Sequence, residues 1–265
     1  MSTTRDDAAV LTRCIDSVTV ITLNRPERLN VIDDVLAKRL RTEVARVGED
    51  RSCRCLVITG SGRAFCAGQA LPAREEEALP EDVAGLIRER YLPIIMGLYR
   101  LTIPVLAAVN GLATGAGFSL ALAADIRIAS EAAWFSCGFS KIGLVPDAGA
   151  TYFLPRLVGI SQATRLAFSG ERVAALSAQQ MGLVASVHPA EDFEVAYLAV
   201  ADELAHGPTA ALARTKQALR ASFHASLDQQ LELEAQLQQA SSLTSDFREG
   251  LRAFRERRPP NFRGH

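Results

Sequence analysis

Residues 104–149 contain the groups most suited to chemistry, namely two glycine-rich turns and one carboxylate. An apolar, strand-like run from Pro104 leads into Gly115-Ala116-Gly117, where a turn opens a helix, and Asp147 lies at a second turn before another helix. The first amides of a helix have no internal partner and lie at the positive end of its dipole, so the Ala116 N–H is suited to stabilise an oxyanion. Close helix packing explains the same glycines equally well, and both interpretations stay open.

A dinucleotide-binding loop is excluded at this turn. The third glycine of a GxGxxG motif would fall at Leu120, and no acidic ribose partner follows at the expected distance. The elements around the turn alternate between strand and helix patterns, which predicts an α/β fold.

The expected elements carry period-2, period-3.6 or continuous apolar patterns. Residues 10–15 and 18–23 predict a hairpin, 35–47 a helix capped by Asp33 or Asp34, 55–59 a buried strand, and 83–99 a helix that Pro93 should kink or divide. Ser161 and Ser177 are expected to cap two further helices, followed by a strand at 183–187 and helices at 192–206, 209–222 and 227–256. Residues 71–82 lose this periodicity and predict a loop.

Composition limits the classes of partner and compartment. The chain has 29 basic and 30 acidic residues, a net charge of −1, so it carries no basic field for nucleic acid or an anionic membrane. Its five cysteines form no CxxC pair, which favours reduced thiols and no metal centre. The polar N-terminus and the absence of a long apolar run predict a cytoplasmic protein. A change in pattern near Gly207-Pro208 predicts a catalytic domain over 1–206 and a helical oligomerisation region over 207–265.

Five segments keep a common order and spacing across residues 10–190. They are 24–30 (NRPERLN), 58–68 (ITGSGRAFCAG), 107–117 (AAVNGLATGAG), 120–129 (LALAADIRIA) and 144–159, which begins LVP and ends LPRLVG. Together they resemble the crotonase family, the enoyl-CoA hydratases and isomerases. The resemblance implies a spiral of ββα units, a C-terminal helical region that forms trimers, and pairs of trimers. It also implies an acyl-CoA thioester substrate, in which CoA is part of the substrate and no separate cofactor is needed.

The resemblance assigns binding groups as well. The amides of Gln69 and Ala116 would hold the thioester oxygen, within a pocket formed by Ala67, Gly68 and Gly115. Paired amides stabilise an enolate more than the carbonyl from which it forms. Arg25 and Arg28 are candidates for the CoA phosphates, although solvated surface charge explains them equally well.

Departures from the family pattern decide between its reactions. The two glutamates of the hydratases match Ser119 and Phe139, which we expect to contact substrate but which cannot together activate water. Asp147 matches a functional aspartate of dienoyl-CoA isomerases, 4-chlorobenzoyl-CoA dehalogenases and phenylacetyl-CoA ring-epoxide isomerases, and it also fits a helix N-cap.

The segments 65–69 and 139–149 most resemble the ring-epoxide isomerases, although that type has Asp where this chain has Ala70. No histidine precedes Pro104, which argues against a dehalogenase. The sequence therefore predicts an enoyl-CoA isomerase with Asp147 as acid and base. Its alternatives are an enoyl-CoA hydratase and a non-catalytic acyl-CoA-binding protein. Burial would raise the pKa of Asp147 and a helix N-terminus would lower it, and the sequence leaves this balance open.

Overall fold

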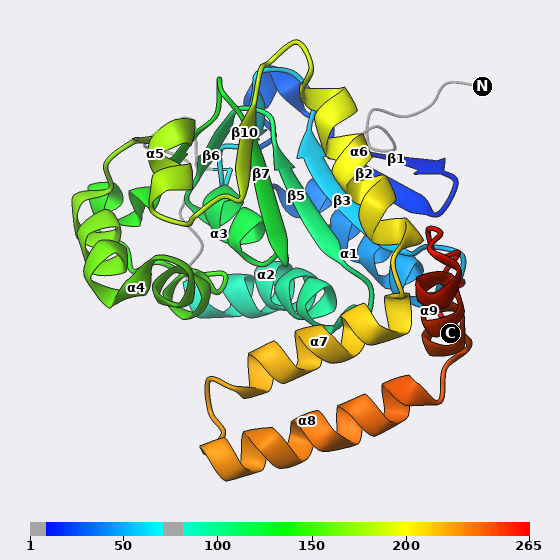
Figure 1. Cartoon of the computed structure of the whole chain (residues 1–265). Coiled ribbons are helices and arrows are strands. Elements are labelled where there is room, and N and C mark those ends of the chain that lie inside the picture. Colours follow the sequence, from blue (N-terminus) through cyan, green and yellow to red (C-terminus); the bar gives the residue numbers. More distant parts are fainter. Residues whose placement is uncertain (1–8, 71–81) are drawn as a thin grey trace.

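A six-stranded sheet forms the core of the computed structural model, which describes residues 9–70 and 82–265 (Figure 1). β1 (Val10–Ile15) and β2 (Val18–Leu23) form the predicted antiparallel hairpin. The sheet then continues in parallel through β3 (Cys55–Gly60), β5 (Val105–Val109), β7 (Ile126–Ser130) and β10 (Ser186–His188). Every residue of β5 is buried, as expected for a parallel strand covered on both faces.

A second sheet of four short strands carries the chain toward the site. Its order is β4 (Ala64–Cys66), β6 (Leu112–Thr114), β8 (Trp134–Ser136) and β9 (Val173–Ala174). β4, β6 and β8 directly follow β3, β5 and β7, and a helix follows each pair, so the expected ββα units are present. The sequence patterns did not reveal these strands because two or three residues are too few to establish a period.

The helices of these units are α1 (Asp34–Glu49), α2 (Val83–Arg100), α3 (Ala116–Leu122) and α4 (Ala150–Ser169). Asp33 caps α1 by accepting from the Leu36 amide at 2.9 Å. α2 continues through Pro93 as one helix, so a division there was wrong, while the alternative of a kink stays a prediction. The buried face of α2 packs against the core on both sides of the proline, and this packing outweighs one lost backbone hydrogen bond.

Three boundaries differ from expectation because tertiary packing or glycine geometry sets them. Gly159, with φ 76° and ψ 159°, interrupts α4 where Ser161 was expected to start a helix. Ser177 lies inside α5 (Ala175–Gln180) and does not cap it. β10 begins at Ser186, while Leu183 is fully buried before it. The loop predicted for residues 71–82 falls almost entirely outside the described residues.

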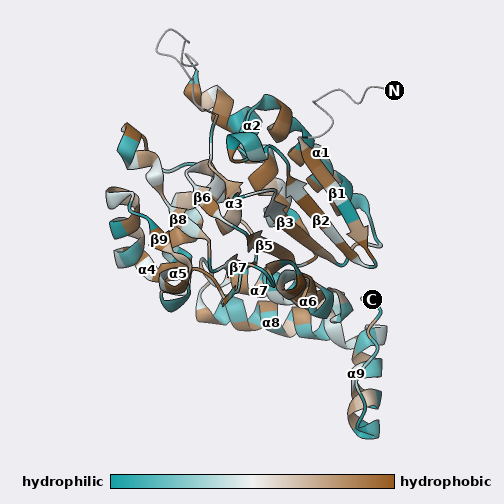
Figure 2. Cartoon of the chain, turned by 90° about the horizontal axis from the view of Figure 1, so that it is seen from above, coloured by the Kyte–Doolittle hydropathy of each residue, from teal (hydrophilic) through white to brown (hydrophobic). Residues whose placement is uncertain are grey.

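The C-terminal part is helical, with α6 (Phe193–His206), α7 (Thr209–Ala221), α8 (Leu227–Ser242) and α9 (Ser245–Glu256). The single helix expected over 227–256 is divided, because the Thr244 side chain accepts from the Phe247 amide at 3.1 Å and caps α9. α7 and α8 pack side by side and extend from the body of the molecule (Figure 1). Apolar residues concentrate in the central strands, whereas α8 and α9 are mostly hydrophilic (Figure 2).

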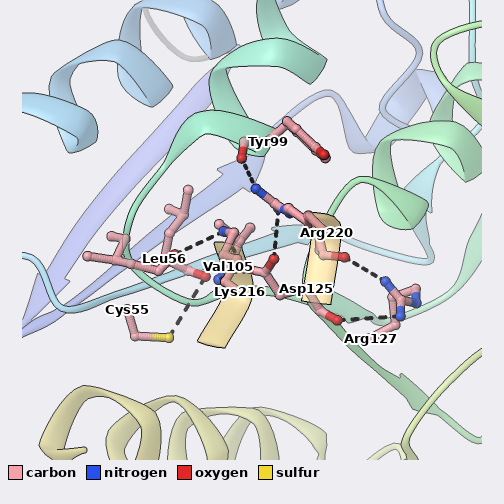
Figure 3. Close-up of polar contacts among 10 residues, drawn as sticks. Cys55, Leu56, Tyr99, Val105, Asp125, Arg127, Lys216 and Arg220 are labelled. Atoms are coloured by element: carbon pink, nitrogen blue, oxygen red, sulfur yellow. Dashed lines mark hydrogen bonds and ion pairs between the residues drawn. The ribbon is translucent and has the colours of Figure 1, made fainter. Parts of the chain in front are cut away.

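A cluster of charges joins α7 to the sheet (Figure 3). Asp125 precedes β7, and its carboxylate accepts from Lys216 Nζ at 2.5 Å, Arg220 Nη2 at 3.0 Å and the Val105 amide at 2.9 Å. Burial lowers the pKa of Lys216, and the Asp125 carboxylate opposes this effect. Arg54 adds bonds to the backbone oxygens of Gly207 and Phe262 at 2.6 and 3.1 Å. The division of the chain at residues 206 and 207 stays a prediction.

Within residues 9–70 and 82–265, no helix is both long and apolar enough to cross a membrane. The same residues contain no group of three or more His, Cys, Asp or Glu side chains placed to hold a metal ion.

Candidate active site

A cavity of about 290 Å³ lies where the second sheet meets α2, α3 and the segment before α4. β4 and β6 pair in parallel, so the residues that follow these strands emerge at the same edge. The wall comes from four segments: Ala67, Gln69 and Ala70; Val83, Leu86, Ile87 and Tyr91; Thr114, Gly115 and Ala116; and Gly138, Phe139, Ile142, Leu144 and Asp147. Asp147 is the one acidic side chain in this set.

Two backbone amides on the wall are available to a ligand. Ile32 N donates to Gly68 O at 2.7 Å and Ala70 N donates to Ile32 O at 3.1 Å. Because neighbouring residues of an extended chain alternate in direction, the N–H of Gln69 faces away from Ile32. Ala116 is the first residue of α3, where amides lack helical partners. Neither N–H has an acceptor among the residues that the structure describes.

Two glycines bring the segments that carry these amides into direct contact. A Cβ on Gly68, which has φ +93°, would lie 2.8 Å from Thr114 O and 3.2 Å from Ala116 N. A Cβ on Gly117 would lie 2.2 Å from Cys66 O. The start of α3 therefore packs backbone to backbone against the segment after β4, which only glycine permits at these positions.

Asp147 presents one carboxylate oxygen without a partner. Its Oδ1 is buried and makes no hydrogen bond to any described residue. Burial raises the pKa of this carboxyl group, and this effect exceeds the lowering by its own backbone N–H. The alternative of an N-cap was wrong, since Gly149 occupies the N-cap position of α4 and no side chain caps the helix. Ala148 and Gly149, at φ 48° and 85°, turn the chain between Asp147 and α4.

Ser119 holds the Asp147 segment through a hydrogen bond to its backbone. Its side chain is fully buried, its hydroxyl lies 2.9 Å from Asp147 O and 3.2 Å from Gly115 O, and it does not line the cavity. This position indicates that Ser119 holds the Asp147 backbone and does not contact the substrate. Phe139 does line the cavity, and with 7% of its surface exposed it contributes an apolar wall.

The two candidate arginines lie outside the cavity wall. Arg28 is half-exposed and pairs with Asp33 at 3.4 Å. Arg25 is partly buried, and its backbone N–H donates to Asn30 Oδ1 at 2.8 Å. The Asn30 amide group in turn donates to Ala64 O at 2.8 Å, so the structure joins this segment to the start of β4. Their contact with CoA stays a prediction.

Sequence reasoning missed Tyr91, which lies on the buried face of α2 and lines the cavity. Its hydroxyl donates to Gln69 Oε1, and burial raises the pKa of the phenol. An aromatic residue in an apolar helical stripe looks like ordinary core, so no sequence signal marked it. Tyr91 and Ile87 also line a second cavity of about 430 Å³ between α2 and α4, whose wall is largely apolar and aromatic.

Comparisons with known proteins show the family of the chain. The family model described as enoyl-CoA hydratase/isomerase matches residues 14–265. The chain is 45% identical to "Probable enoyl-CoA hydratase" of Rhodobacter capsulatus, over 94% of this chain and 95% of that protein. It is 40% identical to 1,2-epoxyphenylacetyl-CoA isomerase of Escherichia coli, over 96% of this chain and 98% of that protein.

A solved structure of enoyl-CoA hydratase from Bacillus anthracis superposes with a TM-score of 0.91 at 31% identity, over 97% of this chain and 100% of that one. The chain therefore belongs to the enoyl-CoA hydratase/isomerase family, the family that its motifs indicated.

Proposed function

We propose that this enzyme isomerises an enoyl-CoA thioester through an enolate, with Asp147 as both acid and base. The observation that carries the proposal is the buried, unpartnered Oδ1 of the half-buried Asp147, on the wall that also holds the Gln69 and Ala116 amides. An acidic group in a cavity with a raised pKa is suited to proton transfer.

In the proposed reaction, the thioester oxygen of a 3-enoyl-CoA accepts hydrogen bonds from the N–H groups of Gln69 and Ala116. The Asp147 carboxylate removes a proton from C2, and the electron pair of the broken C–H bond enters a conjugated dienolate. The same carboxyl group then delivers the proton to C4, which yields the 2-enoyl isomer and restores the carboxylate. The amides stabilise the dienolate more than the starting carbonyl, and loss of one such donor costs about 3 kcal/mol in the barrier.

The burial of Asp147 supports this role. An ordinary aspartate is a weak base for a carbon acid, and the burial that raises its pKa increases its basicity. The kinship with an E. coli protein named 1,2-epoxyphenylacetyl-CoA isomerase extends the proposal to isomerisation of a ring epoxide as a second substrate type.

Hydration is the alternative reaction, and the R. capsulatus relative carries a hydratase name. Addition of water to an enoyl thioester requires groups that orient the water and move its proton. Ser119 does not line the cavity and Phe139 is apolar, so Asp147 is the single acidic side chain at the described wall. This composition favours isomerisation.

The test follows deuterium exchange at C2 of 3-hexenoyl-CoA in heavy water, for the wild type and Asp147→Asn. We expect wild-type exchange and double-bond migration, with both lost in the variant. Equal exchange in the two proteins would refute Asp147 as the base. Rapid hydration of crotonyl-CoA by the wild type would favour the hydratase alternative, and binding of 3-hexenoyl-CoA without turnover would favour a binding protein.

We further propose that Arg25 and Arg28 contact the CoA phosphates. Both arginines belong to the segment that Asn30 joins to β4.

We also propose that residues 207–265 form the contacts of a trimer in the cytoplasm. Large apolar side chains are exposed on α7, α8 and α9, including Leu219, Leu227 and Phe254. Light scattering measures the oligomeric state, and a monomer at micromolar concentration would contradict the trimer.

A further inference from the structure

The contact between Tyr91 and Gln69 leaves one end of the Gln69 side chain available to a ligand. The Tyr91 hydroxyl donates to Gln69 Oε1, which occupies the carbonyl end of the carboxamide. The amino end, Nε2, has no partner among the residues that the structure describes, and it is not among the buried atoms that lack one. Because Gln69 lines the 290 Å³ cavity, this N–H₂ group is accessible there.

Tyr91 also fixes which end of the carboxamide is presented. The residue is 3% exposed, and Gln69 Oε1 is the one acceptor that its hydroxyl has within the described chain. The positive charge of Arg90 opposes the rise in the pKa of Tyr91 that burial causes. If the carboxamide rotated by half a turn, the buried hydroxyl proton would lose its acceptor, which is unfavourable. Nε2 therefore stays directed away from Tyr91.

The position of this donor relates it to the acyl group. Gln69 shares the cavity with Asp147, and its own backbone amide belongs to the proposed thioester site. Tyr91 lines this cavity and also the larger one between α2 and α4, where Leu92, Ile95 and Met96 contribute to the wall. The carboxamide thus places a polar donor beside Tyr91, which lines both cavities. An acyl chain that lies against this donor without an oxygen atom would desolvate it without replacing its hydrogen bonds to water.

We propose that Gln69 Nε2 donates a hydrogen bond to an oxygen atom on the acyl group, so that the site prefers oxygen-bearing acyl-CoA thioesters. The acceptor is a hydroxyl, ketone or epoxide oxygen beyond the thioester. This inference rests on the proposed acyl-CoA site and adds a substrate class to it. Tyr91 is a positioning residue in this arrangement, since it acts through Gln69.

The test is calorimetric binding of hexanoyl-CoA and of its 3-, 4- and 5-hydroxy derivatives, none of which requires turnover. We expect at least one hydroxylated ligand to bind wild type about tenfold more tightly than hexanoyl-CoA, the value of one good hydrogen bond. Gln69→Met keeps the backbone amide and should abolish this preference, while Tyr91→Phe should reduce it by freeing the carboxamide to rotate. Tyr197→Phe, a buried tyrosine on α6 outside both cavities, should retain it.

Each result is decisive because the ratio of the dissociation constants of two ligands does not depend on the fraction of folded protein. Equal binding of all four ligands by wild type, or an unchanged preference in Gln69→Met, would overturn the inference and leave the isomerase proposal intact. Failure of every acyl-CoA to bind would overturn both. Binding with the expected preference but without C2 exchange would support the inference and refute the isomerase proposal.

Discussion

Gly117→Ala tests whether the close approach of two backbone segments builds the site. Gly117 lies in the first turn of α3, directly after Ala116, and its backbone is ordinary helix. On helix propensity alone, alanine would stabilise this position by about 1 kcal/mol. A Cβ there, however, would lie 2.2 Å from Cys66 O and 2.7 Å from Cys66 Cβ.

The structure sets the size of the effect. A carbon atom normally stays about 3.5 Å from such neighbours, so α3 and the segment after β4 must separate by about 1 Å. Overpacking of this kind costs about 1–3 kcal/mol in the free energy of unfolding. The same shift moves the Ala116 amide relative to that of Gln69, and a 1 Å misplacement lowers a rate by about 100-fold.

The assay is the kcat for conversion of 3-hexenoyl-CoA to the conjugated 2-enoyl isomer, followed by ultraviolet absorbance and corrected for the folded fraction. Gly182→Ala is the matched control, because φ +81° strains an alanine by about 1–2 kcal/mol while its Cβ would meet only Leu157 O at 3.6 Å. We expect this control to lose stability and keep its kcat. A kcat for Gly117→Ala close to that of wild type would refute the paired-amide site.

Further predictions concern the two aspartates. Asp147→Asn should lower kcat/KM for isomerisation by about 10³-fold, measured in the same ultraviolet assay. Because burial raises the pKa of Asp147 in the native state, its contribution to stability is present at acid pH and is lost as the pH rises through that pKa. Asp147→Asn should therefore melt at a higher temperature than wild type near neutral pH, and this difference in melting temperature should shrink at acid pH. A difference that does not depend on pH would contradict this reasoning.

Asp125→Asn leaves Lys216 and Arg220 without their carboxylate, and their side chains are only 10% and 25% exposed. Urea unfolding should show a loss of about 3 kcal/mol. Glu194→Gln, which breaks an exposed pair with Arg13, should change stability by less than about 0.5 kcal/mol. Equal effects of the two substitutions would be inconsistent with a partly buried cluster.

Much of the framework was predictable from local patterns. The hairpin β1–β2, the strand β3 and the C-terminal helices follow from apolar periodicity, since each is long enough to repeat its pattern. The helix start at Ala116 followed from the glycine turn, and the family from motifs that keep their spacing. Pro93 does not divide α2 because the local cost of the proline is smaller than the stabilisation from the packing around it.

Sequence alone therefore determined the family, the α/β architecture and the candidate residues, because these depend on patterns along the chain. Tertiary structure decided the environment of those residues. It left Asp147 Oδ1 buried without a partner, formed the hydrogen bond from the Ser119 hydroxyl to the Asp147 backbone, and placed Tyr91 against Gln69. These contacts join residues 22 to 28 positions apart, and the backbone approach that brings them together appears only once β4, β6 and α2 are assembled. Desolvation and hydrogen-bond pairing are properties of that assembly, which is why no local pattern encodes them.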